Sequence, residues 1–212
     1  MKEPSRSAAA VLWESMGDRM SDYELPSWDT TGDQRKRFAA LLSSGVASPW
    51  TTSMGRLFDA VSSLTGLCHR PSFEGQAAMA VEFAAERAQA DERDFAAGYP
   101  LDLTEPADPG SSLVVDWRPM MSAMLDDLRR SCSPELIAAR FHAGLVAGIV
   151  RVAQAAGLPR VVLTGGCFQN GLLLSLARRR LEESGFAVYS HSLVPPNDGG
   201  LSLGQAVIAA HQ

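Results

Sequence analysis

Short runs of β-branched residues alternate with long helical stretches after Pro100, and this alternation constrains the fold more than any other feature of the sequence. Strands separated by helices of about 12 residues or more indicate βαβ units and a parallel or mixed sheet. The pattern predicts strands at residues 99–103, 113–117, 160–163 and 186–189, and helices at residues 120–130, 134–157, 168–184 and 200–210.

The first hundred residues differ, because their apolar side chains recur at helical spacing with no strand between them. This spacing predicts helices at residues 8–17, 32–44, 54–66 and 74–95, the third with Ser53 as its N-cap. We therefore expect one α/β domain with two parts: a helical part, residues 1–98, and an α/β part, residues 99–212.

The charge balance argues against one broad class of function. The chain has 212 residues, with 19 Lys and Arg against 24 Asp and Glu, and its formal charge is −5. Nucleic-acid binding requires clustered basic residues, so we expect no nucleic-acid partner. No apolar run approaches the ~18 residues of a membrane span, and no secretory signal is visible. These features predict a cytoplasmic protein with no membrane partner.

The cysteines and histidines form no recognisable site in the sequence. Cys68, Cys132 and Cys167 lie far apart with no CxxC pair, which favours a reducing compartment over a disulfide framework. Cys167 lies beside a glycine and could be a nucleophile, but a cysteine with no nearby His is more often a small buried residue. The scattered histidines suggest no self-contained zinc site and are assigned no role: His69, His142, His191 and His211.

Two glycine-containing loops follow predicted strands and carry the functional signal. In VVLTGGCFQN, Gly165 and Gly166 separate a strand from a helix; in LVPPNDGGLSLG, Asp198 precedes two glycines and a helix. Glycine lets a ligand approach the backbone, and N–H groups at a helix start favour anionic ligands. Both strands should belong to one parallel run, so both loops emerge at the carboxyl edge of the sheet, where open α/β sheets bind ligands. Together the loops predict a nucleotide pocket.

Each candidate residue also has a structural interpretation. The glycine pair alone is consistent with a tight turn, and an acid placed like Asp198 is most often the N-cap of the next helix. Asp59 lies on the flank of an apolar stripe, where an acid is usually solvated. Gly55, in the first turn of a helix, marks close approach of a ligand or of another backbone. Glu74 matches the positive end of a helix dipole.

Four strings along the chain together resemble a known family. They are TSMGRLFDAVSSLTGLCHRPSFEGQAAM, LVVDWRPMM, VVLTGGCFQN and LVPPNDGGLSLGQAVIA, and the resemblance runs from about Glu3 to the end. The family is that of the hydrogenase maturation carbamoyltransferases, HypF. Its C-terminal part is a TsaD-like (Kae1-type) domain of the actin/Hsp70/sugar-kinase superfamily, which is RNase H-like. The resemblance implies that the chain is the second lobe of such a domain, with a mixed sheet, helices on both faces and an N-terminal helical region.

The resemblance also implies a reaction. Full-length members use carbamoyl phosphate and ATP to make carbamoyl adenylate. They then transfer the carbamoyl group to the C-terminal cysteine of a HypE partner, on the way to the cyanide ligands of nickel–iron hydrogenase. Carried over by motif, the implied nucleotide contacts are Gly55, Asp59, Glu74, Gly165, Gly166 and Asn170. Asp198 is the implied metal ligand and catalytic residue.

Several parts of the family pattern are missing from this chain. In relatives, an acylphosphatase domain, zinc-finger motifs, a YrdC-like domain and the first TsaD lobe precede this region. The histidines that complete the metal site belong to that first lobe. One carboxylate cannot hold a catalytic divalent ion tightly, so we expect the chain alone to be an inactive half-site that needs the missing half in cis or in trans. Two alternatives stay open: a non-catalytic nucleotide- or partner-binding remnant, and a lobe of another kinase or ATPase of the superfamily.

Overall fold

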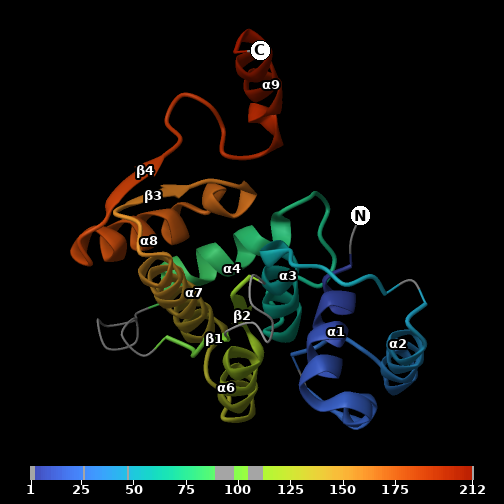
Figure 1. Ribbon diagram of the computed structural model, residues 1–212. Coiled ribbons are helices and arrows are strands. Elements are labelled where there is room, and N and C mark those ends of the chain that lie inside the picture. Colours follow the sequence, from blue (N-terminus) through green and yellow to red (C-terminus); the bar gives the residue numbers. More distant parts are fainter. Residues whose placement is uncertain (1–2, 26, 47, 89–97, 105–111, 212) are drawn as a thin grey trace. The chain divides into compact units, whose positions relative to one another are not determined.

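The computed structural model describes residues 3–25, 27–46, 48–88, 98–104 and 112–211. Figure 1 shows its helices and strands. The chain forms two compact units, Met1–Leu145 and Val146–Gln212, and each is described by itself. The units divide within helix α7 (Pro134–Ala156). The division of the domain into residues 1–98 and 99–212 remains a prediction.

The first part of unit 1 is helical, close to where the apolar spacing predicts helices. Its elements are α1 (Pro4–Met16), η1 (Gly17–Asp22), α2 (Gly32–Ser44), α3 (Met54–Leu64) and α4 (Gln76–Arg87). Local chemistry explains several ends. A proline starts α1, and the side chains of Thr31 and Gln34 form a capping box at the start of α2. The part of the fourth predicted helix between residues 89 and 95 lies outside the described residues.

Helix α3 is the centre of unit 1, because residues 57–64 are all buried. Helices α1 and α4 pack against it. The ring of Phe58 meets that of Phe141 edge-on, with 5.0 Å between centroids, and His142 packs against both rings. An edge-to-face aromatic pair adds about 1 kcal/mol beyond the burial of its area. This packing fixes the orientation of α3 within the unit.

The first predicted strand pair forms, but it begins later than expected. Tyr99, which we placed in the strand, is bound to helices instead: its N–H donates to Arg140 O at 3.1 Å and its hydroxyl donates to Asp127 Oδ2 at 2.7 Å. Gly144 allows this approach, since a Cβ there would lie 2.3 Å from the carbonyl oxygen of Tyr99. The strands are antiparallel and are followed by a helix: β1 (Asp102–Thr104), β2 (Val114–Asp116) and α6 (Arg118–Arg129).

Among the described residues, α7 is the helix that is long and apolar enough to cross a membrane. Arg140 and Arg151 interrupt this helix, so the prediction that no uninterrupted apolar run approaches the length of a membrane span still holds. Packing accounts for its apolar character: 56% of its apolar stretch is buried within the protein, and His142 in its middle is fully buried. A helix that is apolar on most sides is typical of the core of a folded domain as well as of a membrane span.

Unit 2 contains the parallel βαβ arrangement that the sequence predicts. The strands pair in parallel from Arg160↔Ala187 to Leu163↔Ser190, and the connecting helix α8 buries Leu173, Ala177 and Leu181. The helix predicted from residue 168 starts later, because Asn170 caps α8 and a separate 3-10 turn precedes it. The elements are β3 (Arg160–Leu163), η2 (Gly166–Gln169), α8 (Gly171–Glu183), β4 (Ala187–Ser190), η3 (Asp198–Gly200) and α9 (Leu201–Ala210).

Both pairing directions of the expected mixed sheet are present. In the part of the chain that the structure describes, they occur in two separate two-stranded sheets, one in each unit. Helices α6 and α7 lie between these sheets in the sequence. The chain is therefore α/β, and its parallel pair positions the candidate site.

Candidate functional site

The two glycine loops meet at the carboxyl edge of β3 and β4. The Gly165 N–H donates a hydrogen bond of 2.8 Å to the carbonyl oxygen of Pro196. A Cβ built on Gly166 would lie 4.0 Å from Cβ of Asn197, which is ordinary van der Waals contact. The prediction that both loops emerge at one edge of the sheet is confirmed.

The backbone at Gly165 requires glycine. Its φ is 102° and its ψ is 159°, a region that essentially only glycine occupies. No atom lies within 4 Å of where a Cβ would stand, so the constraint comes from the backbone angle and not from crowding. In the described part of the chain, the N–H groups of Gly166 and Cys167 donate to no other backbone group. This turn therefore presents two N–H donors to a ligand.

Asn170 has a structural role in the same loop. Its side chain is buried, and its Oδ1 accepts a hydrogen bond of 2.7 Å from the N–H of Leu173. It is the N-cap of α8. The structure thus explains the amide at this position by capping, and a nucleotide contact by Asn170 remains a proposal.

Asp198 is exposed at the start of η3. The interpretation of Asp198 as the N-cap of the last helix is wrong, because the N-cap of α9 is Gly200. The preceding turn η3 is capped by Asn197, whose Oδ1 accepts from Gly199 N–H at 3.0 Å. No three His, Cys, Asp or Glu side chains gather as a metal site among the described residues. Asp198 therefore supplies a single carboxylate, which does not make up the ligand set of a divalent ion.

Thr164 and His191 lie at the same edge, and the sequence analysis assigned neither a role. Each is the first residue after its strand, and Thr164 Oγ1 lies 2.8 Å from His191 Nε2. The last register pair of the sheet, Leu163↔Ser190, places the next two residues side by side. The sequence signal for this contact is the parallel register, because Thr164 and His191 each lie one residue past the end of a paired strand.

In unit 1, Asp59 is buried, with 7% of its surface exposed. The interpretation as a solvated flank residue is wrong, because α1 and α4 cover α3 on most sides. Arg56 Nη1 lies 2.5 Å from Asp59 Oδ2. Nη1 is thus paired with the Asp59 carboxylate, whereas Nε of Arg56 is buried without a hydrogen-bond partner among the described residues. Such buried donors are usually satisfied by a partner, and a ligand oxygen is one candidate.

Gly55 and Glu74 lie near this part of the sequence in unit 1. Apart from its chain neighbours and the backbone of its own helix, the atom within 4 Å of a Cβ on Gly55 is Ser53 Oγ at 3.6 Å, so no backbone from another described element approaches it. Glu74 is exposed and precedes α4, with Gly75 at a φ of 86° between them. The interpretation of Glu74 as a first-turn acid is therefore wrong, because α4 begins at Gln76.

The predicted site residues divide between the units. Gly55, Asp59 and Glu74 belong to unit 1, and the remaining four belong to unit 2: Gly165, Gly166, Asn170 and Asp198. The contacts described above lie within each unit. Within unit 2, the two loops are joined directly.

Cys167 and His142, to which the sequence analysis assigned no role, are both removed from solvent at least in part. Burial raises the pKa of the Cys167 thiol, so little of the nucleophilic thiolate is present at neutral pH. His142 lies in the aromatic core, where its Nδ1 is 2.8 Å from Ala138 O. Packing in the aromatic core explains His142.

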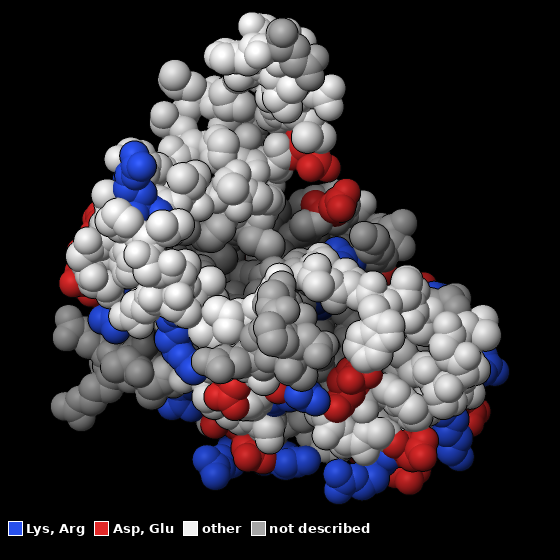
Figure 2. All heavy atoms as spheres, viewed as in Figure 1, with Lys and Arg blue, Asp and Glu red and all other residues white. Residues whose placement is uncertain are grey.

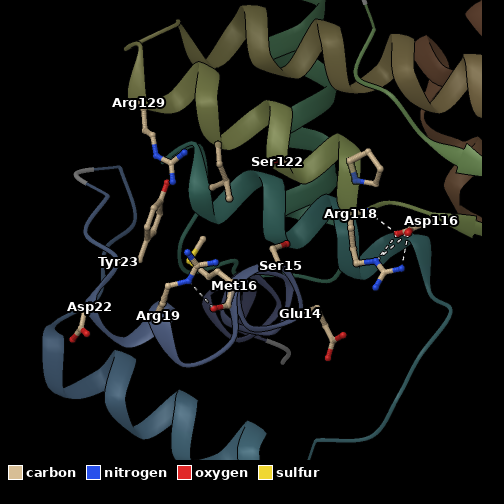
Figure 3. Close-up of a pocket in the computed structure, with 12 residues that line it drawn as sticks. Glu14, Ser15, Met16, Arg19, Asp22, Tyr23, Asp116, Arg118, Ser122 and Arg129 are labelled. Carbon is tan, nitrogen blue, oxygen red and sulfur yellow. Dashed lines mark hydrogen bonds and ion pairs between the residues drawn. The ribbon is translucent and has the colours of Figure 1, made fainter.

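A cleft of about 680 Å³ lies in unit 1 between α1, η1 and α6 (Figure 3), and none of the predicted site residues lines it. Two of its arginines are paired: Arg118 Nη2 lies 2.7 Å from Asp116 Oδ2, and Arg129 Nη1 lies 2.8 Å from Asp126 Oδ1. The guanidinium of Arg129 also lies over the ring of Tyr23, 5.3 Å from its centroid. We assign no ligand to this cleft.

Comparison with known proteins connects this geometry to a family. The chain matches the family model described as "Carbamoyltransferase, Kae1-like Domain, second subdomain" over residues 1–205. It is 37% identical to carbamoyltransferase HypF of Synechocystis sp., across 100% of this chain and 28% of that protein. It is 34% identical to the HypF of Rhodobacter capsulatus, across 98% of this chain and 25% of that protein. The chain thus spans about a quarter of the length of these relatives.

Solved structures agree with this match. The chain is similar to a full-length HypF crystallised in a phosphate- and nucleotide-bound form, with a TM-score of 0.83 and 30% identity over 98% of this chain and 31% of that one. It also has the fold of T. kodakarensis HypF, with a TM-score of 0.74 and 21% identity over 98% of this chain and 27% of that one. The expected Kae1-like fold is confirmed. The chain therefore belongs to the HypF carbamoyltransferase family, as the second subdomain of its Kae1-like domain.

Proposed function

We propose that this chain is the second lobe of a HypF-type carbamoyltransferase and that it binds ATP-derived nucleotide at the carboxyl edge of β3 and β4. The observation that carries the proposal is the hydrogen bond from Gly165 N–H to Pro196 O, because it draws both glycine loops to one place. A ligand at this edge meets both loops. The full-length HypF that shares this fold was crystallised with phosphate and nucleotide, which supports the same ligand class here.

The chain offers donors that suit such a ligand. The N–H groups of Gly166 and Cys167 would donate to phosphate oxygens, and the flanking glycine keeps the approach open. Gly55 and Asp59 are the proposed ribose neighbours, and the buried Nε of Arg56 beside Asp59 suits a ligand oxygen. The other proposed nucleotide contacts are Glu74, Gly165 and Asn170.

The proposed reaction moves a carbamoyl group from carbamoyl adenylate to a cysteine thiol of a HypE-type acceptor. The sulfur attacks the carbamoyl carbon, the bond from that carbon to the phosphate oxygen breaks, and AMP leaves while the thiol loses its proton. Fixed N–H donors would stabilise the negative charge that remains on the leaving phosphate. Asp198 would be this chain's contribution to a metal site, and no step is assigned to a metal, because one carboxylate does not complete such a site.

The proposed location is the cytoplasm. All three cysteines are free thiols, as is usual in a reducing compartment. The acceptor cysteine in the proposed reaction must also be reduced in order to attack. The proposed partners are therefore the rest of the HypF protein and a HypE-type acceptor.

Nucleotide binding is tested by calorimetric titration of ADP into the chain, with and without Mg²⁺. We expect the wild type to bind and Asp198→Ala to weaken the Mg²⁺-dependent part of binding at an unchanged melting temperature, since Asp198 is exposed and caps no helix. Glu182→Ala, which removes another exposed acid of unit 2, is the matched control and should bind normally. A wild-type chain that fails to bind ADP would refute the proposal.

The catalytic part is tested by carbamoyl transfer from carbamoyl phosphate and ATP to a purified HypE-type acceptor. We expect no transfer by the chain alone, and transfer when it is mixed with the preceding part of the Synechocystis relative. Carbamoyl transfer by the chain alone would contradict the hypothesis that it is an inactive half-site. A mixture that binds nucleotide but transfers nothing would instead identify a non-catalytic remnant.

A further inference from the structure

The contact between Thr164 and His191 lies at the edge where the two loops meet. Thr164 directly precedes Gly165, and His191 is the first residue of the loop that contains Pro196. The 2.8 Å contact between Thr164 Oγ1 and His191 Nε2 joins the ends of β3 and β4. The hydrogen bond from Gly165 N–H to Pro196 O is a second tie between the same two loops. Both ties lie within unit 2, so the pair has a defined place in it.

The strand register also gives these two side chains a common face. Side chains alternate along a strand, so Thr164 and His191 continue the face of Val162 and Tyr189, which are register partners. That face is open: Val162 is 62% exposed and Tyr189 is 53% exposed, whereas Leu163 is buried. Thr164 and His191 are exposed as well. The imidazole is therefore accessible to a ligand.

The contact with Thr164 involves Nε2 of the His191 ring, and Nδ1 is the ring's second nitrogen. His191 Nδ1 makes no hydrogen bond to the part of the chain that the structure describes. When the threonine hydroxyl donates to Nε2, the neutral ring carries its proton on Nδ1 and becomes a donor. A ring held at one nitrogen presents the other in a fixed direction. Such a donor suits an anionic oxygen.

We propose that His191 is a ligand-positioning residue of the nucleotide edge, held through Nε2 by Thr164 and donating from Nδ1 to a phosphate oxygen of the nucleotide at Gly165 and Gly166. This inference rests on the proposed nucleotide site and adds a residue to it. Thr164 acts only through His191. The alternative is that the pair is a purely structural tie between two strands.

Two amide substitutions separate these roles. In His191→Gln the side-chain amide reaches the position of Nε2, so it keeps the contact with Thr164 and leaves nothing at Nδ1. In His191→Asn the amide occupies the position of Nδ1 and loses Thr164. We expect His191→Gln to keep the wild-type melting temperature and to weaken ADP binding about tenfold, as the loss of one hydrogen bond to a charged group does. His191→Asn should retain more ADP affinity than His191→Gln.

Adenosine is the second probe, because it has no phosphate. We expect His191→Gln to leave adenosine binding unchanged while ADP binding falls. Equal ADP affinity of His191→Gln and wild type, or equal losses for ADP and adenosine, would overturn the role of His191 while the nucleotide site stands. A wild-type chain that binds neither probe would overturn the nucleotide site and this inference with it. Should His191→Gln not fold, Thr164→Val removes the hydroxyl that contacts His191 Nε2 and is expected to lower the affinity for ADP but not for adenosine. Unchanged ADP affinity of Thr164→Val would overturn the inference.

Discussion

Gly55 and Gly165 are both proposed neighbours of a nucleotide, yet the backbone requires glycine at only one of them. Gly165 has a φ of 102°, where a side chain is strained, whereas Gly55 lies in the first turn of α3, where a Cβ would make only an ordinary contact with Ser53 Oγ at 3.6 Å. We expect Gly165→Ala to lower the free energy of unfolding by about 1–3 kcal/mol. Gly55→Ala should leave it unchanged or raise it by up to about 1 kcal/mol, because alanine favours a helix. Urea unfolding of both variants measures this difference.

Gly55→Ala also tests whether Gly55 is present because a ligand approaches α3 at this point. Because the variant keeps the fold, a loss of ADP affinity would come from steric exclusion of the ligand. An unchanged affinity would show that no ligand approaches α3 at this point. A variant that unfolds would contradict the open space at Gly55.

At the scale of elements, α6 and α7 are joined through one buried carboxylate. Asp127 accepts hydrogen bonds of 2.7 Å from both Tyr99 Oη and Arg140 Nη1. Burial alone would raise the pKa of Asp127, but these hydrogen bonds outweigh it and hold the pKa below the ordinary aspartate value. A lowered pKa in the folded state stabilises the fold above the unfolded pKa of about 4, and this contribution disappears as the pH falls through the folded pKa. We expect the free energy of unfolding to decrease as the pH is lowered from about 5 to 3.

Asp127→Asn tests this dependence. It should destabilise the fold by ~2 kcal/mol at pH 7, because it removes the charged partner of a half-buried arginine. It should also flatten the pH dependence between about pH 5 and 3. Asp126→Asn is the matched control, since that acid is exposed and its pair with Arg129 lies on the surface. A pH profile of Asp127→Asn that is as steep as that of the wild type would contradict the assignment.

At the scale of the whole molecule, α9 is an apolar helix that no other described part of the chain buries. All of its residues are exposed, and the large apolar ones range from 50% at Leu203 to 62% at Ile208. Figure 2 shows no Lys, Arg, Asp or Glu on the visible face of this helix, whereas both signs of charge alternate over unit 1. Burying a leucine or isoleucine side chain stabilises by about 1.5–3 kcal/mol. An exposed apolar surface of this kind favours association with another surface.

The corresponding prediction concerns self-association. We expect the chain by itself to form concentration-dependent oligomers in sedimentation velocity, and Leu203→Ser with Ile208→Ser to reduce them. Leu158→Ser is the control, because Leu158 is 65% exposed but lies outside α9 and should change little. Oligomers that persist in the double variant, or a chain that stays monomeric at all concentrations, would refute the role of α9. Addition of the preceding part of a relative should also dissolve the oligomers.

The sequence by itself determined the elements and the edge at which the site lies. Period and turn residues predicted helices and strands such as β3, and parallel order alone brought the glycine pair and Asp198 to one edge. Helices and strands depend on neighbouring residues, and the shared edge follows from the order of parallel strands. Neither depends on which side chains pack together. The family strings added the Kae1-like identity, which the comparisons confirmed.

Only the tertiary structure decided what each polar side chain contacts. Helical spacing placed Asp59 on a flank, but packing by α1 and α4 buried it; Tyr99 suited a strand, but α6 and α7 hold it by hydrogen bonds. Gly200, not Asp198, is the N-cap of α9, and the His191 ring contacts the Thr164 hydroxyl across the sheet. Burial and hydrogen-bond partners depend on residues distant in sequence, whereas periodicity reports only the residue's own element. That is why the sequence located the edge, and the fold determined which side chains act there.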